Sequence, residues 1–144
     1  MTASQLLSPS SRPDAGLAIL RVVLGIIFVA HGAQKLFVFG LDGVAGGFAQ
    51  MGAPLPEVTA PLVAFGEFAG GIALTLGLFS RVVSVALAAI MLGALLIVHL
   101  PNGFFMPAGI EFVLALMAGA IALAITGPGS YSLDAAIVRR QASH

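Results

Sequence analysis

The sequence predicts an all-α membrane protein, a four-transmembrane-helix bundle with a first outer loop that lies partly at the membrane interface. Three observations support this fold class. Hydrophobic residues make up 59 % of the chain and charged residues only 8 %, whereas soluble domains contain about 25 % charged residues. Four apolar stretches each reach the roughly 20 residues that a helix needs to cross a bilayer. None of these stretches shows the period-two alternation of a half-buried strand.

The four predicted helices follow one another along a chain of 144 residues, which we interpret as one membrane domain. They comprise residues 15–39, 60–79, 82–100 and 108–126. The first stretch is too long for the apolar region of a signal peptide, so we interpret it as a retained anchor. Residues 1–14, rich in serine and proline, are expected to form a flexible tail. Residues 127–144 are expected to form a second tail that contains a short surface helix beginning at Ser132 or Asp134.

The predicted connections between the helices differ in character. Only Ser80 and Arg81 separate the second helix from the third, which indicates a tight hairpin. The first connection, residues 40–59, is long, and Phe48 and Met51 among its glycines and prolines suggest a segment at the interface or folded back over the bundle. Residues 101–109 are uncharged and aromatic, which suits the headgroup level of a bilayer.

The basic residues predict the orientation. With four spans, the same side of the membrane receives Arg12, Arg81, Arg139 and Arg140. The connections on the opposite side contain Asp42 and Glu57 and no basic residue. The positive-inside rule therefore places both termini in the cytoplasm. Arg21, near the inner end of the first helix, is interpreted as an anchor whose side chain snorkels to the interface.

The other ionisable residues inside the predicted spans all fall in their outer half; they are His31, Lys35, Glu67, His99 and Glu111. At a rise of 1.5 Å per residue, His31 lies roughly 12 Å and Glu67 roughly 10 Å below the outer helix ends. An ionised group at the bilayer centre costs at least about 2.5–3.5 kcal/mol, so such groups face the bundle interior and pair, or they serve a function. We therefore predict that these five residues bind a ligand in an outer-facing polar pocket, with His31 and Glu67 as candidate catalytic residues.

Each of these residues also has a simpler interpretation. Lys35 and Glu111 lie close enough to the interface to snorkel, and His99 has the surroundings of an interfacial polar residue. His31 and Glu67 are compatible with a structural hydrogen bond between helices, because polar side chains also hold membrane helices together.

Composition excludes several functional classes. The chain has no cysteine, which removes disulfides, thiol redox chemistry, thiolate metal sites and covalent haem attachment. Its net charge is zero, and nucleic-acid binding needs a clustered basic face. We assign no metal ligands from local spacing, although His31 and His99 on different helices are compatible with haem or a transition metal. The lipid bilayer is the expected partner, and the Gly66-x-x-x-Gly70 pattern weakly indicates a homo-oligomer.

Four motifs occur in order between residues 17 and 134: LRVVLGIIFVAHGAQKLF, GEFAGGIALTLGLFSR, HLPNGFF followed by EF, and GPGSYSLD. With these motifs the sequence resembles the DoxX family of small bacterial inner-membrane proteins. The HG-x-x-K pattern of that family falls on His31, Gly32 and Lys35, and its second-helix glutamate falls on Glu67. Its third-helix histidine falls on His99. The later positions that match are Gly103, Phe104, Glu111 and the GPG-x-x-SLD segment, residues 127–134.

The resemblance implies a four-helix fold in the bacterial inner membrane. Members of the family are described as membrane subunits of oxidoreductases, including a thiosulfate:quinone oxidoreductase, or as partners of soluble detoxifying enzymes. Our main hypothesis is therefore a membrane subunit that binds a quinone or small lipophilic molecule and works with a soluble oxidoreductase partner. The alternatives are a non-catalytic carrier of a lipophilic ligand, a haem- or metal-binding protein, and a docking scaffold. Whether the chain is itself an enzyme stays open.

Overall fold

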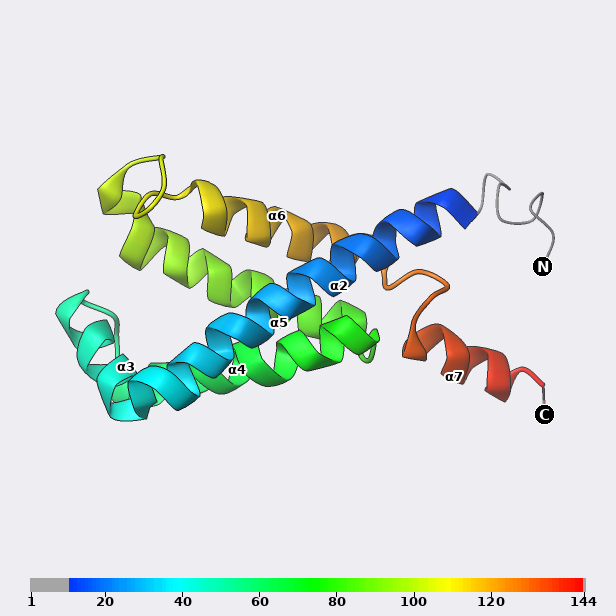
Figure 1. The fold of residues 1–144 in the computed structure, drawn as a ribbon, viewed down its shortest axis with the longest axis horizontal. Helices are drawn as coiled ribbons and strands as arrows, with labels where there is room; N and C mark the ends of the chain where they lie inside the picture. Colours follow the sequence, from blue (N-terminus) through cyan, green and yellow to red (C-terminus); the bar gives the residue numbers. More distant parts are fainter. Residues whose placement is uncertain (1–10, 144) are drawn as a thin grey trace.

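The computed structural model describes residues 11–143, and within them it contains helices and no strand. The N-terminal half consists of α2 (Ser11–Ala33), the π-helical turn η1 (Gln34–Phe39), α3 (Gly40–Gln50) and α4 (Pro56–Leu76). The C-terminal half consists of α5 (Ser80–Ala94), the π-helical turn η2 (Leu95–His99), the 3₁₀ turn η3 (Leu100–Asn102), α6 (Glu111–Thr126) and α7 (Leu133–Gln141). The predicted all-α class is confirmed (Figure 1).

Three of these helical stretches are long and apolar enough to cross a membrane: Arg12–Gln50, Pro56–Leu76 and Ser80–Asn102. The fourth apolar helix, α6, has 16 residues. At 1.5 Å per residue it is about 24 Å long, which is shorter than the roughly 30 Å hydrocarbon core of a bilayer. Residues 108–110, which we expected to open this helix, are not helical. The fold therefore has three helices of spanning length and a shorter fourth one.

Two predicted boundaries differ from the structure at the N-terminal half. Helix α2 begins at Ser11, so residues 11–14 are helical, while residues 1–10 of the predicted tail lie outside the described residues. The first connection is mostly helix, because residues 40–50 form α3. Gly40 adopts a φ of +69°, which glycine tolerates, and the chain changes direction there. α3 then packs on the start of α4 through Val44, Ala45 and Ala60.

Two helix pairs make up the bundle, since α2 packs along α4 and α5 packs along α6 (Figure 1). Between them lies one apolar core whose largest fully buried side chains are Phe28, Leu74, Leu87 and Leu123. The exposed surface of the spanning helices is apolar as well, as a lipid-facing surface requires.

Glycines allow α2 and α4 to approach closely. A Cβ atom on Gly32 would lie 2.4 Å from the backbone nitrogen of Phe68, and a Cβ atom on Gly71 would lie 2.6 Å from that of Val29. Small residues serve this purpose in membrane helices because they let backbones touch. Gly66 and Gly70, by contrast, face side chains of α5 in the same chain. The pattern that suggested a homo-oligomer is thus used for packing within one chain.

Arginine side chains close one end of the bundle, where the start of α2, the α4–α5 turn and α7 meet; we call it the terminal end (Figure 1). Arg21 is 3 % exposed, and its guanidinium donates to the carbonyl oxygens of Leu74 at 3.2 Å, Thr75 at 3.1 Å and Tyr131 at 2.5 Å. Unpaired carbonyls at a helix C-terminus carry partial negative charge, which a cation neutralises. Arg21 therefore reaches the terminal end of the bundle, as we expected of an anchor, but its partners there are carbonyl oxygens of the protein. Arg81 binds the last carbonyls of α6 in the same way.

The short helix α7 confirms the predicted surface helix in the C-terminal tail. Ser132 is its N-cap and accepts a hydrogen bond from the Ala135 amide at 3.2 Å. The carboxylate of Asp134 accepts from the amides of Phe79 at 2.8 Å and Ser80 at 2.9 Å, and so caps the start of α5. The SLD segment thereby fastens the tail to the tight α4–α5 turn.

Candidate functional site

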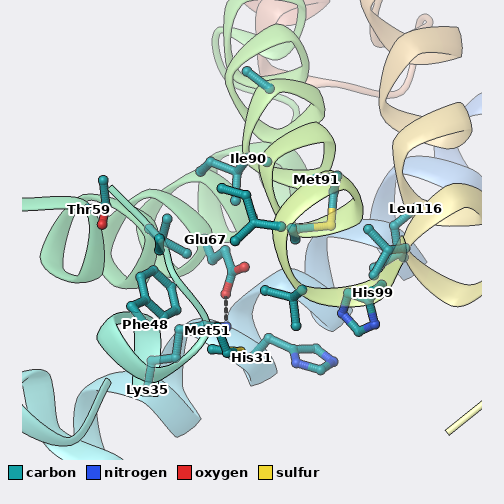
Figure 2. Close-up of a pocket in the computed structure, with 18 of the residues that line it drawn as sticks. His31, Lys35, Phe48, Met51, Thr59, Glu67, Ile90, Met91, His99 and Leu116 are labelled. Atoms are coloured by element: carbon teal, nitrogen blue, oxygen red, sulfur yellow. Dashed lines mark hydrogen bonds and ion pairs between the residues drawn. The ribbon is translucent and has the colours of Figure 1, made fainter. Parts of the chain in front are cut away.

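A pocket of about 800 Å³ lies at the opposite end of the bundle, which we call the pocket end. Ligand sites in proteins commonly enclose 300–1,000 Å³ and combine apolar walls with a few polar groups. The walls here come from α2, α3, α4, α5 and the start of α6, and most of the lining side chains are apolar. The ionisable residues that line it are His31, Lys35, Glu67 and His99 (Figure 2).

An ion pair joins two of these residues across the α2–α4 contact. Lys35 Nζ lies 2.6 Å from Glu67 Oε2, and the Glu67 residue is only 3 % exposed. It is the one salt bridge within residues 11–143. A carboxylate buried in a membrane helix is costly unless a cation compensates it, and Lys35 supplies that cation to Glu67 beside an apolar cavity. Glu67 points into the pocket from α4 (Figure 2).

The two histidines enter the pocket from different helices. His31 belongs to α2, and its ring centroid lies 5.9 Å from that of Phe112 in α6. His99 closes the π-helical turn η2, and its Nδ1 lies 2.8 Å from the carbonyl oxygen of Ala108. A carbonyl oxygen only accepts hydrogen bonds, so this contact places the proton on Nδ1 and leaves Nε2 of a neutral ring as an acceptor.

Glu111 is the predicted site residue that does not line the pocket. Its Oε1 accepts a hydrogen bond of 2.6 Å from the backbone amide of Met106. That bond closes the connection between α5 and α6, which supplies Met106 and Pro107 to the pocket wall. Glu111 therefore shapes the pocket through the backbone and does not face a ligand there.

Four of the five predicted residues converge, and the structure adds what their spacing did not reveal. Lys35 and His99 both lie on π-helical turns, a distortion that occurs mostly as isolated turns and frequently at functional sites. Phe48 and Met51 of the α3 region also line the pocket. Their apolar side chains among glycines and prolines had suggested a segment folded back over the bundle, whereas nothing in the sequence indicated the two π-helical turns.

The pocket offers hydrogen-bond groups of both kinds. Lys35 has three N–H donors, one of which points to Glu67, and Glu67 has a second carboxylate oxygen that can accept. No group of three or more His, Asp or Glu side chains within residues 11–143 is close enough to hold a metal ion. The arrangement therefore suits an organic molecule with an apolar body and polar oxygen atoms.

Comparison with known proteins identifies the family. The model of the family described as DoxX matches residues 16–100. The chain belongs to the DoxX family. A DoxX-like relative from Bacillus subtilis, named "Putative oxidoreductase CatD", is 36 % identical over 121 residues, which cover 84 % of this chain and 86 % of the relative. The inner membrane protein YphA of Escherichia coli is 35 % identical over 82 % of this chain and 87 % of its own length.

A third DoxX relative, the inner membrane protein YqjF of Escherichia coli, is 32 % identical and covers 84 % of this chain and 91 % of the relative. No solved structure matches the chain. Membership of the DoxX family and these two inner-membrane relatives agree with the long apolar helices in describing a multi-pass membrane protein.

Proposed function

We propose that this chain is the membrane subunit of a redox or detoxification system and that it binds a quinone or another small lipophilic molecule in its pocket. One observation carries the proposal: a charged pair, Lys35 and Glu67, lies in the wall of an otherwise apolar cavity of about 800 Å³. Ionisable residues inside membrane segments are expensive and by default indicate a functional site. The name of the Bacillus relative, which describes an oxidoreductase, also supports a role in a redox system.

A quinone fits the chemistry of the pocket. Its ring and tail are apolar, and its two carbonyl oxygens accept hydrogen bonds. Lys35 and His31 are positioned to donate to such oxygens, while Glu67 and the Nε2 atom of His99 can accept from the hydroxyl groups of the reduced form. The volume and the apolar lining suit the rest of the molecule.

Turnover of a quinone needs groups that move protons and a source of electrons. Reduction of one quinone to its quinol consumes two electrons and two protons. His31 and Glu67 are the proposed proton donors and acceptors, because a histidine and a carboxylate can change protonation state during a reaction. The two electrons would come from a soluble oxidoreductase partner, since the sequence contains no recognisable electron carrier. We place the pocket end on the outer side of the membrane, because the arginines gather at the terminal end.

Ligand binding can be tested by native mass spectrometry of the full chain in mild detergent, with decylubiquinone as the added probe. We expect the wild-type protein to bind the quinone. For Glu67→Gln we expect a dissociation constant at least tenfold higher, because the isosteric amide loses the charge that holds Lys35. Glu57→Gln is the matched control, since Glu57 is exposed, lies on the same helix and does not line the pocket. The melting temperatures of both variants are measured as well, so that a loss of binding is not confused with unfolding.

The outcomes separate the candidate functions. Bound quinone that a soluble reductant and partner convert to quinol supports the redox subunit. Binding of lipophilic molecules without turnover supports a non-catalytic carrier, which uses the same apolar lining. Copurified haem or metal would replace the proposal with a haem- or metal-binding protein. Polypeptide that binds neither quinone nor metal in repeated preparations would contradict the ligand site and leave a docking scaffold.

A further inference from the structure

Helix α7 is held at a defined level of the molecule, the level at which the spanning helices end. Asp134, in its first turn, receives hydrogen bonds from the amides of Phe79 and Ser80, and its own amide donates to the Gly77 carbonyl at 2.9 Å. These three bonds attach α7 to the turn between α4 and α5, two helices of spanning length. Because such a turn marks the edge of the hydrocarbon region, the first turn of α7 is fixed at the depth of the lipid headgroups.

The surface of α7 exposes apolar side chains at that depth. Ile137 is 46 % and Val138 63 % exposed, and Leu133 and Tyr131 are also exposed. Leu133 and Ile137 are four residues apart, so their side chains leave the helix on one face. In Figure 1, α7 stands away from the four-helix bundle, and its C-terminal half leads away from the spanning helices.

Positive charge accompanies this apolar surface. Arg139 and Arg140 occupy the last turn of α7 and are exposed. The Arg139 guanidinium donates to the carbonyl oxygen of Ser130 at 3.3 Å, which leaves its charge uncompensated, and no carboxylate lies within ion-pair distance of either guanidinium in residues 11–143. The two acidic residues at this end are already engaged, Asp134 in the cap of α5 and Asp14 in a hydrogen bond with Ser130. The charge on α7 is therefore available to an anion outside the chain.

We infer that α7 is a binding site for anionic phospholipids. The helix leaves the end of the bundle roughly along the direction of the spanning helices (Figure 1), so Leu133 and Ile137 lie nearest the acyl chains and the guanidinium groups of Arg139 and Arg140 lie further out, bound to phosphate oxygens. Basic residues just outside the hydrocarbon region are attracted to anionic lipids in this way. Bilayer lipid is favoured over a protein partner because the hydrogen bonds of Asp134 hold the start of the helix at headgroup depth. The site is separate from the pocket and does not depend on the proposed function.

The position of α7 can be measured with a single fluorophore, because the chain contains no tryptophan. The full chain carrying Ile137→Trp is reconstituted into vesicles of phosphatidylcholine and phosphatidylglycerol, some with brominated acyl chains. We expect blue-shifted emission that brominated lipid quenches. Gln141→Trp, at the polar end of α7, is the control and should be quenched less. Emission from Ile137→Trp at the wavelength of an indole in water, without quenching, would overturn the interfacial placement.

The lipid preference is measured by native mass spectrometry of protein taken from mixed vesicles. A basic residue near an anionic surface contributes about 1 kcal/mol, which is about fivefold in affinity. We therefore expect the double variant Arg139→Gln/Arg140→Gln to lose at least about fivefold of the preference for phosphatidylglycerol over phosphatidylcholine. Arg12→Gln removes an exposed charge at the same end but outside α7 and should lose less.

Three outcomes would contradict the inference. Equal losses in the double variant and in Arg12→Gln would show that the preference comes from the charge of the whole terminal end. Competition by millimolar inorganic phosphate would indicate a phosphate site in place of a lipid site. An unchanged preference in a double variant with wild-type thermal stability would exclude α7 as the site.

Discussion

Lys35 and Glu67 form the one salt bridge of residues 11–143. Their 2.6 Å contact neutralises a carboxylate that is almost inaccessible to solvent. A buried ion pair is worth little relative to two apolar residues, because desolvation offsets the attraction between the charges. Removal of one partner is expensive, because the other charge stays buried alone. The pair is thus a poor source of stability, which agrees with the function that we propose for it.

This dependence predicts a non-additive pair of variants. Lys35→Met leaves Glu67 without its cation and should destabilise the protein by about 3–5 kcal/mol. Lys35→Met/Glu67→Leu removes both charges and should recover most of that loss. Thermal unfolding in detergent provides the measurement. Equal stability of the single and double variants would contradict the coupling between the two residues.

At the scale of helices, the contact between α2 and α4 places these two residues together. Gly25, Gly32 and Gly71 are the positions where the backbones approach. Lys35 lies less than one turn beyond Gly32, and Glu67 lies four residues before Gly71. The close contact between α2 and α4 therefore brings Lys35 within ion-pair distance of Glu67. The glycines contribute to the pocket in this way although they carry no functional group.

A comparison of two glycines in the same helix tests this contact. In Gly32→Ala the new methyl group would lie 2.4 Å from the backbone nitrogen of Phe68, so α2 and α4 must separate. In Gly16→Ala the methyl group meets nothing within 4 Å. We expect Gly32→Ala to lower the melting temperature by several degrees, and Gly16→Ala to leave it unchanged or raise it, because alanine favours helix by about 1 kcal/mol over glycine. Similar melting temperatures would show that the helices adjust freely.

At the scale of the whole molecule, the two ends of the bundle use their charged residues differently. The terminal end holds all five arginines, and two of them, Arg21 and Arg81, bind carbonyl oxygens at helix C-termini. The pocket end holds the only lysine and four of the six acidic residues. One end is closed by hydrogen bonds to the backbone, and the other encloses a cavity. The same division of charge predicts that the terminal end faces the cytoplasm.

The absence of cysteine makes the topology directly measurable. Arg12→Cys and Ser143→Cys should react with a membrane-impermeant maleimide only from the cytoplasmic side, and Asp42→Cys only from the outer side. The first two positions share a side if the chain crosses the membrane an even number of times. Labelling of Arg12→Cys and Ser143→Cys from opposite sides would show that α6, with its 16 residues, does not span.

Much of the fold could be predicted because apolar run length and the sparse charges are local properties of the sequence. They predicted the helical membrane class, a tight turn between the second and third helices and the short C-terminal helix. The structure places that turn at residues 77–79, because Ser80 and Arg81 already belong to α5. They also predicted that His31, Lys35, Glu67 and His99 all fall in the outer half of their helices, because depth follows from position along a helix. Membrane insertion makes this reasoning effective, since every backbone polar group must be paired within the membrane and only helices or closed barrels achieve this.

Only the tertiary structure decided which of these polar groups meet, and the physical reason is that a contact between helices depends on their rotation and distance. It paired Lys35 with Glu67, assigned Glu111 to a backbone amide and buried Arg21 against carbonyl oxygens. Side-chain rotation about a helix axis and the separation of two helices are set by packing against neighbours, here by glycines that admit a backbone. The depth of a side chain in the membrane follows from its position along its own helix, whereas its hydrogen-bond or ion-pair partner depends on how two helices pack against each other.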